Sequence, residues 1–276
     1  MDWLKYGIRL GLFGIFAFCG LSQPVVASEN TDAKLEKILK GDHRSDKYQA
    51  RDKYRHPVET LSFFGLKDNM TVVEIFPGGG WYTEILAPFL KDKGTFYAAG
   101  NDPASEKKFL RESAKRFKRK MDSTPIYSKV NITVLAPPQK TEIAPADTAD
   151  MVLTFRNIHN WMKGGYVDDV FNAMYKALKP GGILGVVEHR GNPDKPQDPE
   201  AGSGYVNQDH TIALAKKAGF RFLASSEINA NPKDTKDHPK GVWTLPPTFA
   251  LKDKDHEKYS AMGESDRFTL KFHKPE

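Results

Sequence analysis

The sequence predicts an α/β fold, a doubly wound three-layer sandwich in which helices cover both faces of a mostly parallel sheet. Two observations carry this prediction. Short apolar runs alternate with longer segments of helical periodicity from about residue 31 onward, and strands that alternate with helices form right-handed βαβ units and a parallel sheet. The 276 residues also contain no internal repeat or low-complexity tract, and this length suits one large domain with appendages.

Each predicted strand is a short run rich in apolar residues. The five runs expected to form the parallel part of the sheet span residues 72–76, 95–99, 132–135, 151–155 and 183–188. Residues 220–225 are expected to form a sixth strand, and residues 267–272 alternate apolar and polar side chains, as an antiparallel edge strand does. Helical periodicity marks the segments 33–39, 48–64, 81–90, 107–120, 166–178 and 211–218.

Composition and charge narrow the class of protein. With 39% hydrophobic and 28% charged residues, the chain has the composition of a soluble globular protein. The formal net charge of +6 permits contact with anionic partners without requiring it. The most basic stretch, 107–120, places Leu110, Ala114 and Phe117 at helical spacing, so its cations are expected on a solvated helix face. Aromatic residues do not interleave with them, and no nucleic-acid partner is expected.

The N-terminus has the pattern of a secretory signal peptide. Lys5 and Arg9 precede an apolar run over residues 10–21, and small residues lead up to Ala27. The run is shorter than the roughly 20 apolar residues of a spanning helix, so we expect cleavage after Ala27 and no stable membrane span afterwards. The protein is then exported, to the periplasm or the exterior. The alternative is a retained anchor that leaves the domain on the cytoplasmic face.

The predicted organisation is a signal peptide (1–27), an N-terminal helical cap (28–65) and a main domain (66–276). Within the main domain, residues from about 229 to 266 are rich in Pro, Lys, Asp and His and read as a long loop excursion between the last two strands. Cys19 is the only cysteine and lies in the segment expected to be removed. The mature chain would contain no disulfide and no Cys-ligated metal.

The strongest chemical signal is a glycine turn after the first predicted strand. Glu74 lies in this strand, which ends in Pro77-Gly78-Gly79-Gly80, and a helix is expected to follow. A glycine turn between a strand and a helix lets the backbone approach a ligand closely, and the start of the helix offers free N–H groups. The context indicates a site for a nucleotide-type ligand.

This turn resembles the first motif of class I S-adenosylmethionine-dependent methyltransferases, an acidic residue followed after one position by three alternating glycines. Glu74, Gly78 and Gly80 match it, whereas Phe76 stands where the first glycine is usual. Further segments resemble the fourth-strand motif and the turn into strand five, at residues 150–161 and 177–182. Together with these, residues 54–57, 77–84 and 155–161 resemble a bacterial group of predicted methyltransferases, over most of residues 45–276.

The resemblance implies a Rossmann-like fold and S-adenosyl-L-methionine as cofactor. It implies that Glu74, Gly78 and Gly80 surround the methionine moiety, with Tyr82 and Thr83 at the start of the following helix. The acidic residue that holds the ribose is displaced, because Gly100 takes its place. We expect Asp102 to serve instead, since a carboxylate accepts two hydroxyl hydrogen bonds. Asn157 would lie beside the sulfonium.

Methyl transfer from a sulfonium needs a positioned nucleophile and a proton acceptor, and the donor itself needs no metal. His159 and His189 are the candidate bases, because each follows a strand whose carboxyl end faces the ligand side of the sheet. Either histidine could instead hydrogen-bond a loop. Arg190 could bind an anionic substrate or pair with Glu188 or Asp194. The other histidines show no ligand spacing, and no metal site is expected.

Three residues of the N-terminal helical segment, Tyr54, Arg55 and His56, are candidate substrate-binding residues. In methyltransferases of this fold such a segment often covers the cofactor cleft, so these residues could contact the acceptor. A purely structural role at the sheet edge is the alternative.

The sequence therefore predicts methyl transfer to an unidentified small-molecule or envelope acceptor. A cytosolic cofactor conflicts with an exported enzyme, so a non-catalytic, exported ligand-binding protein on a reused methyltransferase fold is the alternative. A dehydrogenase is disfavoured, because the dinucleotide motif needs a glycine where Phe76 stands.

Overall fold

A computed structural model describes residues 25–276, with side chains from residue 31 onward. The predicted signal peptide falls outside the described residues, apart from 25–27 at the start of the first helix. Among the described helices, none has the length and apolar character needed to cross a bilayer.

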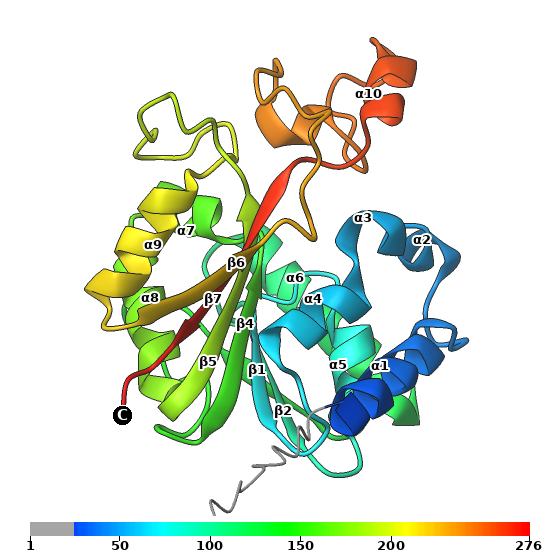
Figure 1. Ribbon diagram of the computed structural model, residues 1–276, viewed down its shortest axis with the longest axis vertical. Helices are drawn as coiled ribbons and strands as arrows, with labels where there is room; N and C mark the ends of the chain where they lie inside the picture. The colour runs from blue at the N-terminus through cyan, green and yellow to red at the C-terminus, as the bar shows by residue number, and fades with distance from the viewer. Residues whose placement is uncertain (1–24) are drawn as a thin grey trace, which may run out of the picture.

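Residues 25–276 contain one seven-stranded sheet with the order β3-β2-β1-β4-β5-β7-β6 (Figure 1). β1 pairs in parallel with β2 and β4, and β7 runs antiparallel to both β5 and β6. The strands are β1 (Thr71–Ile75), β2 (Thr95–Gly100), β3 (Val130–Val134), β4 (Ala149–Phe155), β5 (Leu178–His189), β6 (Arg221–Ser226) and β7 (Arg267–His273). The predicted fold class, mostly parallel with an antiparallel last strand, is confirmed.

Helices cover both faces of the sheet, as Figure 1 shows. One face packs against α7 (Ile158–Gly164), α8 (Val167–Ala177) and α9 (Gln208–Lys217). The other face packs against α1 (Val25–Leu39), α4 (Pro57–Phe64), α5 (Thr83–Leu90) and α6 (Lys108–Asp122). Shorter elements are α2 (Asp46–Gln49), α3 (Asp52–Arg55), η1 (Pro125–Tyr127), η2 (Gly241–Thr244) and α10 (His256–Met262).

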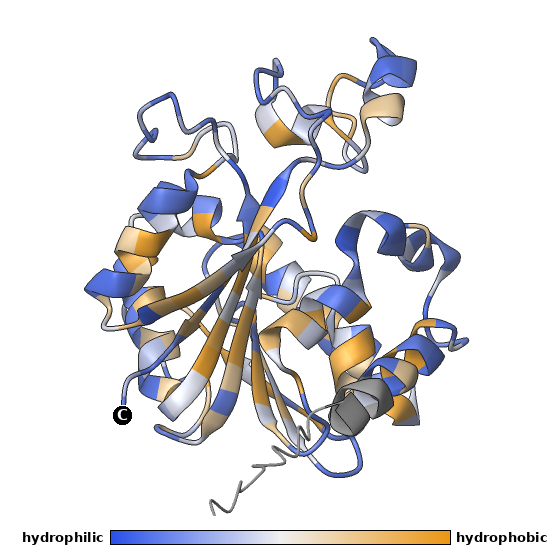
Figure 2. Cartoon of the chain, in the orientation of Figure 1, coloured by the Kyte–Doolittle hydropathy of each residue, from blue (hydrophilic) through white to orange (hydrophobic). Residues whose placement is uncertain are grey.

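Side chains alternate between the two faces of the sheet along each strand and so contribute to two apolar cores, one on each face. In β1, Val73 and Ile75 belong to the core beneath α8, whereas Val72 belongs to the core beneath α4 and α5. Glu74 shares the face of Val72, because side chains two apart point the same way. Figure 2 shows the strands as an apolar band between more polar outer surfaces. The alternation of side chains in β1 therefore directs the carboxylate of Glu74 toward the start of α5.

The edge position predicted for the last strand is wrong. β7 lies between β5 and β6, so β6 is the outer strand. The polar positions of β7 suggested an edge, yet Arg267 and Thr269 are only 2% and 0% exposed. They are buried because other segments provide hydrogen-bond partners, such as the Asn229 amide that donates to Thr269 Oγ1 at 2.9 Å.

The helix predicted over 48–64 is broken into α2, α3 and α4. The break falls at His56, whose φ is 40°. Pro57 begins α4, and the ring of a proline disfavours helical geometry in the residue before it. The break turns α3 toward the carboxyl end of the sheet.

The segment after β6 folds over the carboxyl end of the sheet (Figure 1) and contains α10, which the sequence reading treated as loop. Asp234 holds this segment against Tyr205 and the start of β7. Its carboxylate accepts hydrogen bonds from the Tyr205 hydroxyl at 2.8 Å and from the backbone N–H of Asp266 at 2.8 Å. His238 contacts the same carboxylate at 2.8 Å. The carboxyl ends of the strands are thereby covered by chain from both termini.

Candidate active site

The turn between β1 and α5 adopts the left-handed backbone that a glycine motif indicates. Gly78 and Gly80 have φ values of 59° and 82°, and Phe76 also lies in this region, at 46°. The backbone N–H of Phe76 donates to the Ala99 carbonyl of β2 at 2.8 Å. A Cβ at Gly78 would meet nothing within 4 Å. The turn therefore keeps the geometry of the motif despite Phe76, and Gly78 faces open space.

Glu74 points from β1 toward the start of α5 and is only 2% exposed. Its Oε2 accepts a hydrogen bond from the Thr83 hydroxyl at 2.6 Å. Burial raises the pKa of the Glu74 carboxyl to about 7. Nearby, the Tyr82 ring stacks on Phe155 with centroids 3.4 Å apart, and the Tyr82 hydroxyl donates to the Arg55 carbonyl at 3.3 Å.

Two cavities meet at this turn and share Phe76, Pro77 and Gly78. The larger, of about 880 Å³, extends from the ends of β1 and β2 between α6 and the edge strand β3. The smaller, of about 210 Å³, we call the arginine cavity. Its polar lining consists of Tyr48, Arg51, Arg55, Glu74, Tyr82, Arg156 and Asn157.

The position of these cavities follows from the strand order. β1 lies between β2 and β4, and the connections leave the sheet toward opposite sides at this point. Ligands of open α/β sheets bind at such a switch point, beyond the carboxyl ends of the strands. The joined cavities are therefore where the fold favours a ligand.

Asp102 is placed away from the cavity lining. Its carboxylate pairs with Lys140 Nζ at 2.5 Å and accepts the backbone N–H of Ala104 at 2.9 Å. Asn101, its neighbour, lines the larger cavity together with Gly100. An Asp side chain committed to a lysine is less available to a ribose than the neighbouring amide.

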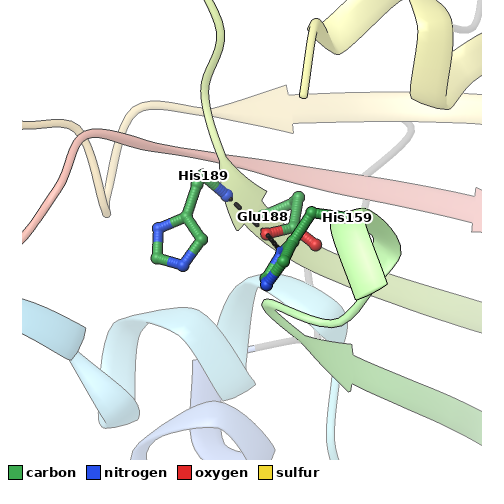
Figure 3. A group of neighbouring side chains, drawn as sticks. All are labelled: His159, Glu188 and His189. Atoms are coloured by element: carbon green, nitrogen blue, oxygen red, sulfur yellow. Dashed lines mark hydrogen bonds and ion pairs between the residues drawn. The ribbon is translucent and has the colours of Figure 1, made fainter. Parts of the chain in front are cut away.

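Glu188, His159 and His189 form a compact group at the ends of β4 and β5 (Figure 3). Glu188 is fully buried, and its Oε2 accepts the backbone N–H of Ile158 at 2.6 Å. Its Oε1 accepts the backbone N–H of His189 at 2.8 Å and contacts His159 Nδ1 at 3.2 Å. Because a carboxylate is an acceptor, Nδ1 of His159 is the donor, which leaves Nε2 as the ring's acceptor.

His189 occupies a strongly desolvated position beside this pair. Its ring centroid lies 5.4 Å from that of His159, and its Nδ1 is 2.5 Å from Ser265 Oγ. Burial lowers the pKa of His189 well below its usual value, and the charge of His159 in its protonated form and that of Arg267 lower it further. The imidazole of His189 is therefore neutral at pH 7.

The same three residues have ligand atoms within 4.8 Å of one another, which is a spacing that a metal ion could use. Two features argue against a cation. The Glu188 oxygens already accept two backbone N–H groups, and Arg55, Arg156 and Arg267 act electrostatically on His189. The absence of a metal stays a prediction.

The other predicted substrate residues fall in different places. Arg190 pairs with Glu227 at 2.6 Å and lies 3.7 Å from Asp266, so its partners are neither of the two acids expected. Arg55 lines the arginine cavity, whereas Tyr54 and His56 do not. The Tyr54 carbonyl instead accepts a hydrogen bond from Arg267 Nη1 at 2.9 Å.

The structure thus joins Arg55, Glu74, Gly78, Tyr82 and Asn157 around one cavity, and places His159 beside His189. The roles assigned to them stay predictions. Sequence reasoning missed Arg51, Arg156, Glu188 and Glu264. Of these, Glu188 carried a usable signal, because it is an acidic residue at the buried end of an apolar strand.

The comparisons with known proteins concern the fold. No protein-family model and no curated protein matches the sequence. Among solved structures, an S-adenosylmethionine-dependent methyltransferase from Aquifex aeolicus is similar at 20% identity, over 72% of this chain and 93% of that one, with a TM-score of 0.51. The [4+2]-cyclase SpnF is similar at 15% identity, over 90% and 96% of the two chains, with a TM-score of 0.55.

A third similar structure is phosphoethanolamine N-methyltransferase 2 of Haemonchus contortus in complex with S-adenosyl-L-methionine, at 16% identity and a TM-score of 0.50. The match covers 88% of this chain and 60% of that one. The protein therefore has the Rossmann-like fold of class I methyltransferases, and its reaction must be argued from its site.

Proposed function

We propose that this protein transfers a methyl group from S-adenosyl-L-methionine to a small-molecule or envelope acceptor. The observation that carries the proposal is the pair of cavities that meet at the β1–α5 turn. The larger cavity, with Gly100 and Asn101 at its rim, suits a nucleoside. The side chains of Glu74 and Asn157, rather than the arginines that share their cavity, suit the polar methionine end.

The side chains around the turn fit the groups of this cofactor. Ionised Glu74 is an acceptor for an ammonium group, and one of its oxygens is already positioned by Thr83. The open space at Gly78 leaves room for a ligand against the backbone. Asn101 replaces Asp102 as the candidate partner of the ribose, because Asp102 is paired with Lys140.

The chemistry required of the chain is positioning and proton removal. When bound, the cofactor supplies an electrophilic methyl group on its sulfonium. His159 is the base that we assign, since Glu188 holds its Nδ1–H and thereby fixes the tautomer with a lone pair on Nε2. The neutral imidazole of His189 and the ring of Trp243, 5.9 Å from that of His159, pack around this base and limit the access of water.

The test is S-adenosylhomocysteine formation by the purified protein with pools of small metabolites and envelope fractions. In the presence of an active acceptor, His159→Ala is expected to lower kcat by roughly 10²- to 10⁴-fold, the usual contribution of a general base. Cofactor affinity should not change. A variant as active as the wild type would exclude His159 as the base.

A second candidate function is non-catalytic ligand binding on a reused methyltransferase fold. It is favoured by Phe76, because this residue replaces the usual first glycine of the motif and has a left-handed backbone with a φ of 46°. Binding of S-adenosylhomocysteine without methylation of any fraction would favour this alternative. That a cyclase shares the fold is consistent with reuse.

Export is part of the proposal and depends on residues 1–27. Determining the N-terminal sequence of the protein from its own cell tests it. A chain that starts at Ser28 supports export, and an intact Met1 places the enzyme with the cytosolic cofactor instead.

A further inference from the structure

Four arginines gather where the N-terminal helices meet the carboxyl ends of β4 and β7. We call Arg51, Arg55, Arg156 and Arg267 the arginine cluster. Arg51 Nε donates to Glu264 Oε1 at 2.5 Å, Arg267 Nη2 donates to Glu264 Oε2, and Arg55 Nε lies 3.6 Å from Glu264 Oε2. One carboxylate is thus shared by three guanidinium groups.

Several donors of the cluster form no hydrogen bond within the described part of the chain. Arg55 and Arg267 side chains are each 3% exposed, and Nε and Nη1 of Arg55 and Nε of Arg267 are buried without a hydrogen bond. The guanidinium of Arg156 forms no hydrogen bond or ion pair with any residue of 31–276. Buried donors of this kind are costly unless a ligand satisfies them.

The cluster also carries an excess of positive charge. Its four cations share the carboxylate of Glu264, and Glu74, which lines the same cavity as three of them, has a pKa raised by burial to about 7. Burial and Arg267 lower the pKa of Arg156 to about 10, which leaves it charged at neutral pH. The side chains of Arg55 and Arg267 are buried, and uncompensated buried charge destabilises a fold, so the cluster favours a bound anion.

Three of the four arginines reach a cavity. Arg51, Arg55 and Arg156 all line the arginine cavity, next to Asn157. Arg156 follows β4 directly, with a left-handed φ of 62°, and strained backbone of this kind is concentrated at functional sites. The charges of Arg267, Arg156 and Arg55 also act on His189, so the cluster lies near the histidine pair as well as near the glycine turn.

The cofactor cannot neutralise this charge. S-adenosylmethionine has one carboxylate but both an ammonium and a sulfonium, so it adds more positive charge than negative. The carboxylate of the cofactor could pair with one guanidinium group, but the excess positive charge of the arginine cluster would remain. The compensating anion must therefore come from a second ligand.

We propose that the methyl acceptor is a small anion whose carboxylate or phosphate group binds the guanidinium groups of Arg156 and Arg55 in the arginine cavity. This inference rests on the proposed function, because it assigns the chemical class of the acceptor. Planar guanidinium groups bind both oxyanions through paired N–H donors. An acceptor held in this way lies close to Asn157, which lines the same cavity.

The experiment is calorimetry in two steps on wild type, Arg156→Gln, Arg156→Lys and the control Arg221→Gln. Arg221 is exposed and pairs with His273 at the opposite end of the sheet. The first step titrates S-adenosylhomocysteine and reports on the proposed function. The second titrates inorganic phosphate and then succinate into protein saturated with S-adenosylhomocysteine.

We expect one of the two anions to bind the saturated wild type and the Arg221→Gln control equally. Arg156→Gln should weaken anion binding at least 10-fold and change S-adenosylhomocysteine affinity less than 3-fold. Arg156→Lys, which keeps the charge but loses the planar fork, should fall between. Thermal unfolding of Arg156→Lys and Arg156→Gln checks that both variants fold. Because Arg156→Gln removes an unpaired charge, its midpoint of thermal unfolding should be higher than that of the wild type in anion-free buffer.

Two results would overturn the inference while leaving the proposed function intact. One is the absence of anion binding to the saturated wild type at 50 mM. The other is competition between the anion and S-adenosylhomocysteine, with both weakened equally by Arg156→Gln, because the arginines would then hold the carboxylate of the cofactor. If S-adenosylhomocysteine does not bind the wild type at all, the proposed function fails, and the assignment of an acceptor fails with it.

Discussion

At the scale of single residues, burial sets the protonation of the groups nearest the proposed chemistry. Glu74 sits beneath the glycine turn with a pKa that burial raises to about 7. His189 is held neutral because burial lowers its pKa. An acid that ionises near neutrality can respond to a cationic ligand, and a neutral imidazole does not repel one. Both shifts are consistent with a site that receives a sulfonium and an ammonium.

Replacing Glu74 with Gln should stabilise the protein at alkaline pH. The folded state keeps a proton that the unfolded chain loses between pH 4.5 and about 7, so raising the pH across this window destabilises the wild type. Gln escapes the cost, which amounts to about 3 kcal/mol above pH 7. Urea denaturation at pH 8 and pH 5 measures it, and the gain should fall from about 3 kcal/mol at pH 8 to below about 1 kcal/mol at pH 5.

The same variant tests the assigned role of Glu74 in binding. If the ionised carboxylate holds the ammonium, wild-type affinity for the cofactor should rise about tenfold from pH 6 to pH 8, and Glu74→Gln should bind weakly at both. Glu142→Gln, at an exposed position, is the matched control. A pH-independent wild-type affinity would contradict the assignment.

The sequence located the residues of the site that belong to a local motif and missed those that do not. Glu74, Gly78 and Asn157 follow directly from strand ends and a glycine turn, and they line one cavity. Arg156 and Glu264 gave no comparable signal, because their importance depends on a cluster assembled from distant segments. Asp102 was chosen on its chemistry alone, and its pairing with Lys140 could not be read from the sequence.

At the scale of elements, the apolar runs predicted the strands closely, because strands of a parallel sheet that is covered on both faces are mostly apolar. The run at 72–76 became β1 at Thr71–Ile75. Helices were less well predicted where one residue overrides periodicity, as Pro57 does between α3 and α4. The edge position of β7 was misjudged because buried polar residues in a strand resemble exposed ones until their partners are known.

The turn after β1 offers a direct test of backbone strain. Phe76→Ala and Phe76→Gly both remove the ring, whose centroid lies 6.3 Å from that of Trp161, so both should destabilise the protein. At a φ of 46°, the Gly variant should be the more stable of the two by about 1 kcal/mol. At positions with negative φ, an Ala variant is normally more stable than the Gly variant. If Phe76→Ala were the more stable of the two, the turn would not be strained.

At the scale of the whole molecule, Glu264 connects segments from the two ends of the chain. It pairs with Arg51, 213 positions away, and with Arg55 and Arg267. Burial by itself raises the pKa of Glu264, but Arg267, Arg55 and Arg51 outweigh it and hold the pKa well below its usual range. This contact fixes α3 over the cavity, and no pattern in the sequence indicated it.

Replacing Glu264 with Gln should destabilise the fold by about 3–5 kcal/mol at pH 7, since it leaves buried arginines without their carboxylate. The stabilisation by Glu264 is complete above its unfolded pKa and is lost as the pH falls below it. The difference in free energy of unfolding between wild type and Glu264→Gln should therefore be about 1 kcal/mol smaller at pH 4 than at pH 7. Urea denaturation checks both values, with the exposed Glu257→Gln of α10 as control. Equal stability at pH 7 would contradict the prediction.

The central claim is that the cavities at the β1–α5 turn bind S-adenosylmethionine, and titration calorimetry of the purified chain tests it most directly. We predict micromolar affinity, about −8 kcal/mol, for both S-adenosylmethionine and S-adenosylhomocysteine. Gly78→Arg should abolish binding, whereas Gly181→Arg should not, because Gly181 has a similar φ of 75° and open space around its Cβ but lies at the start of β5. Absence of wild-type binding at millimolar ligand would contradict the account.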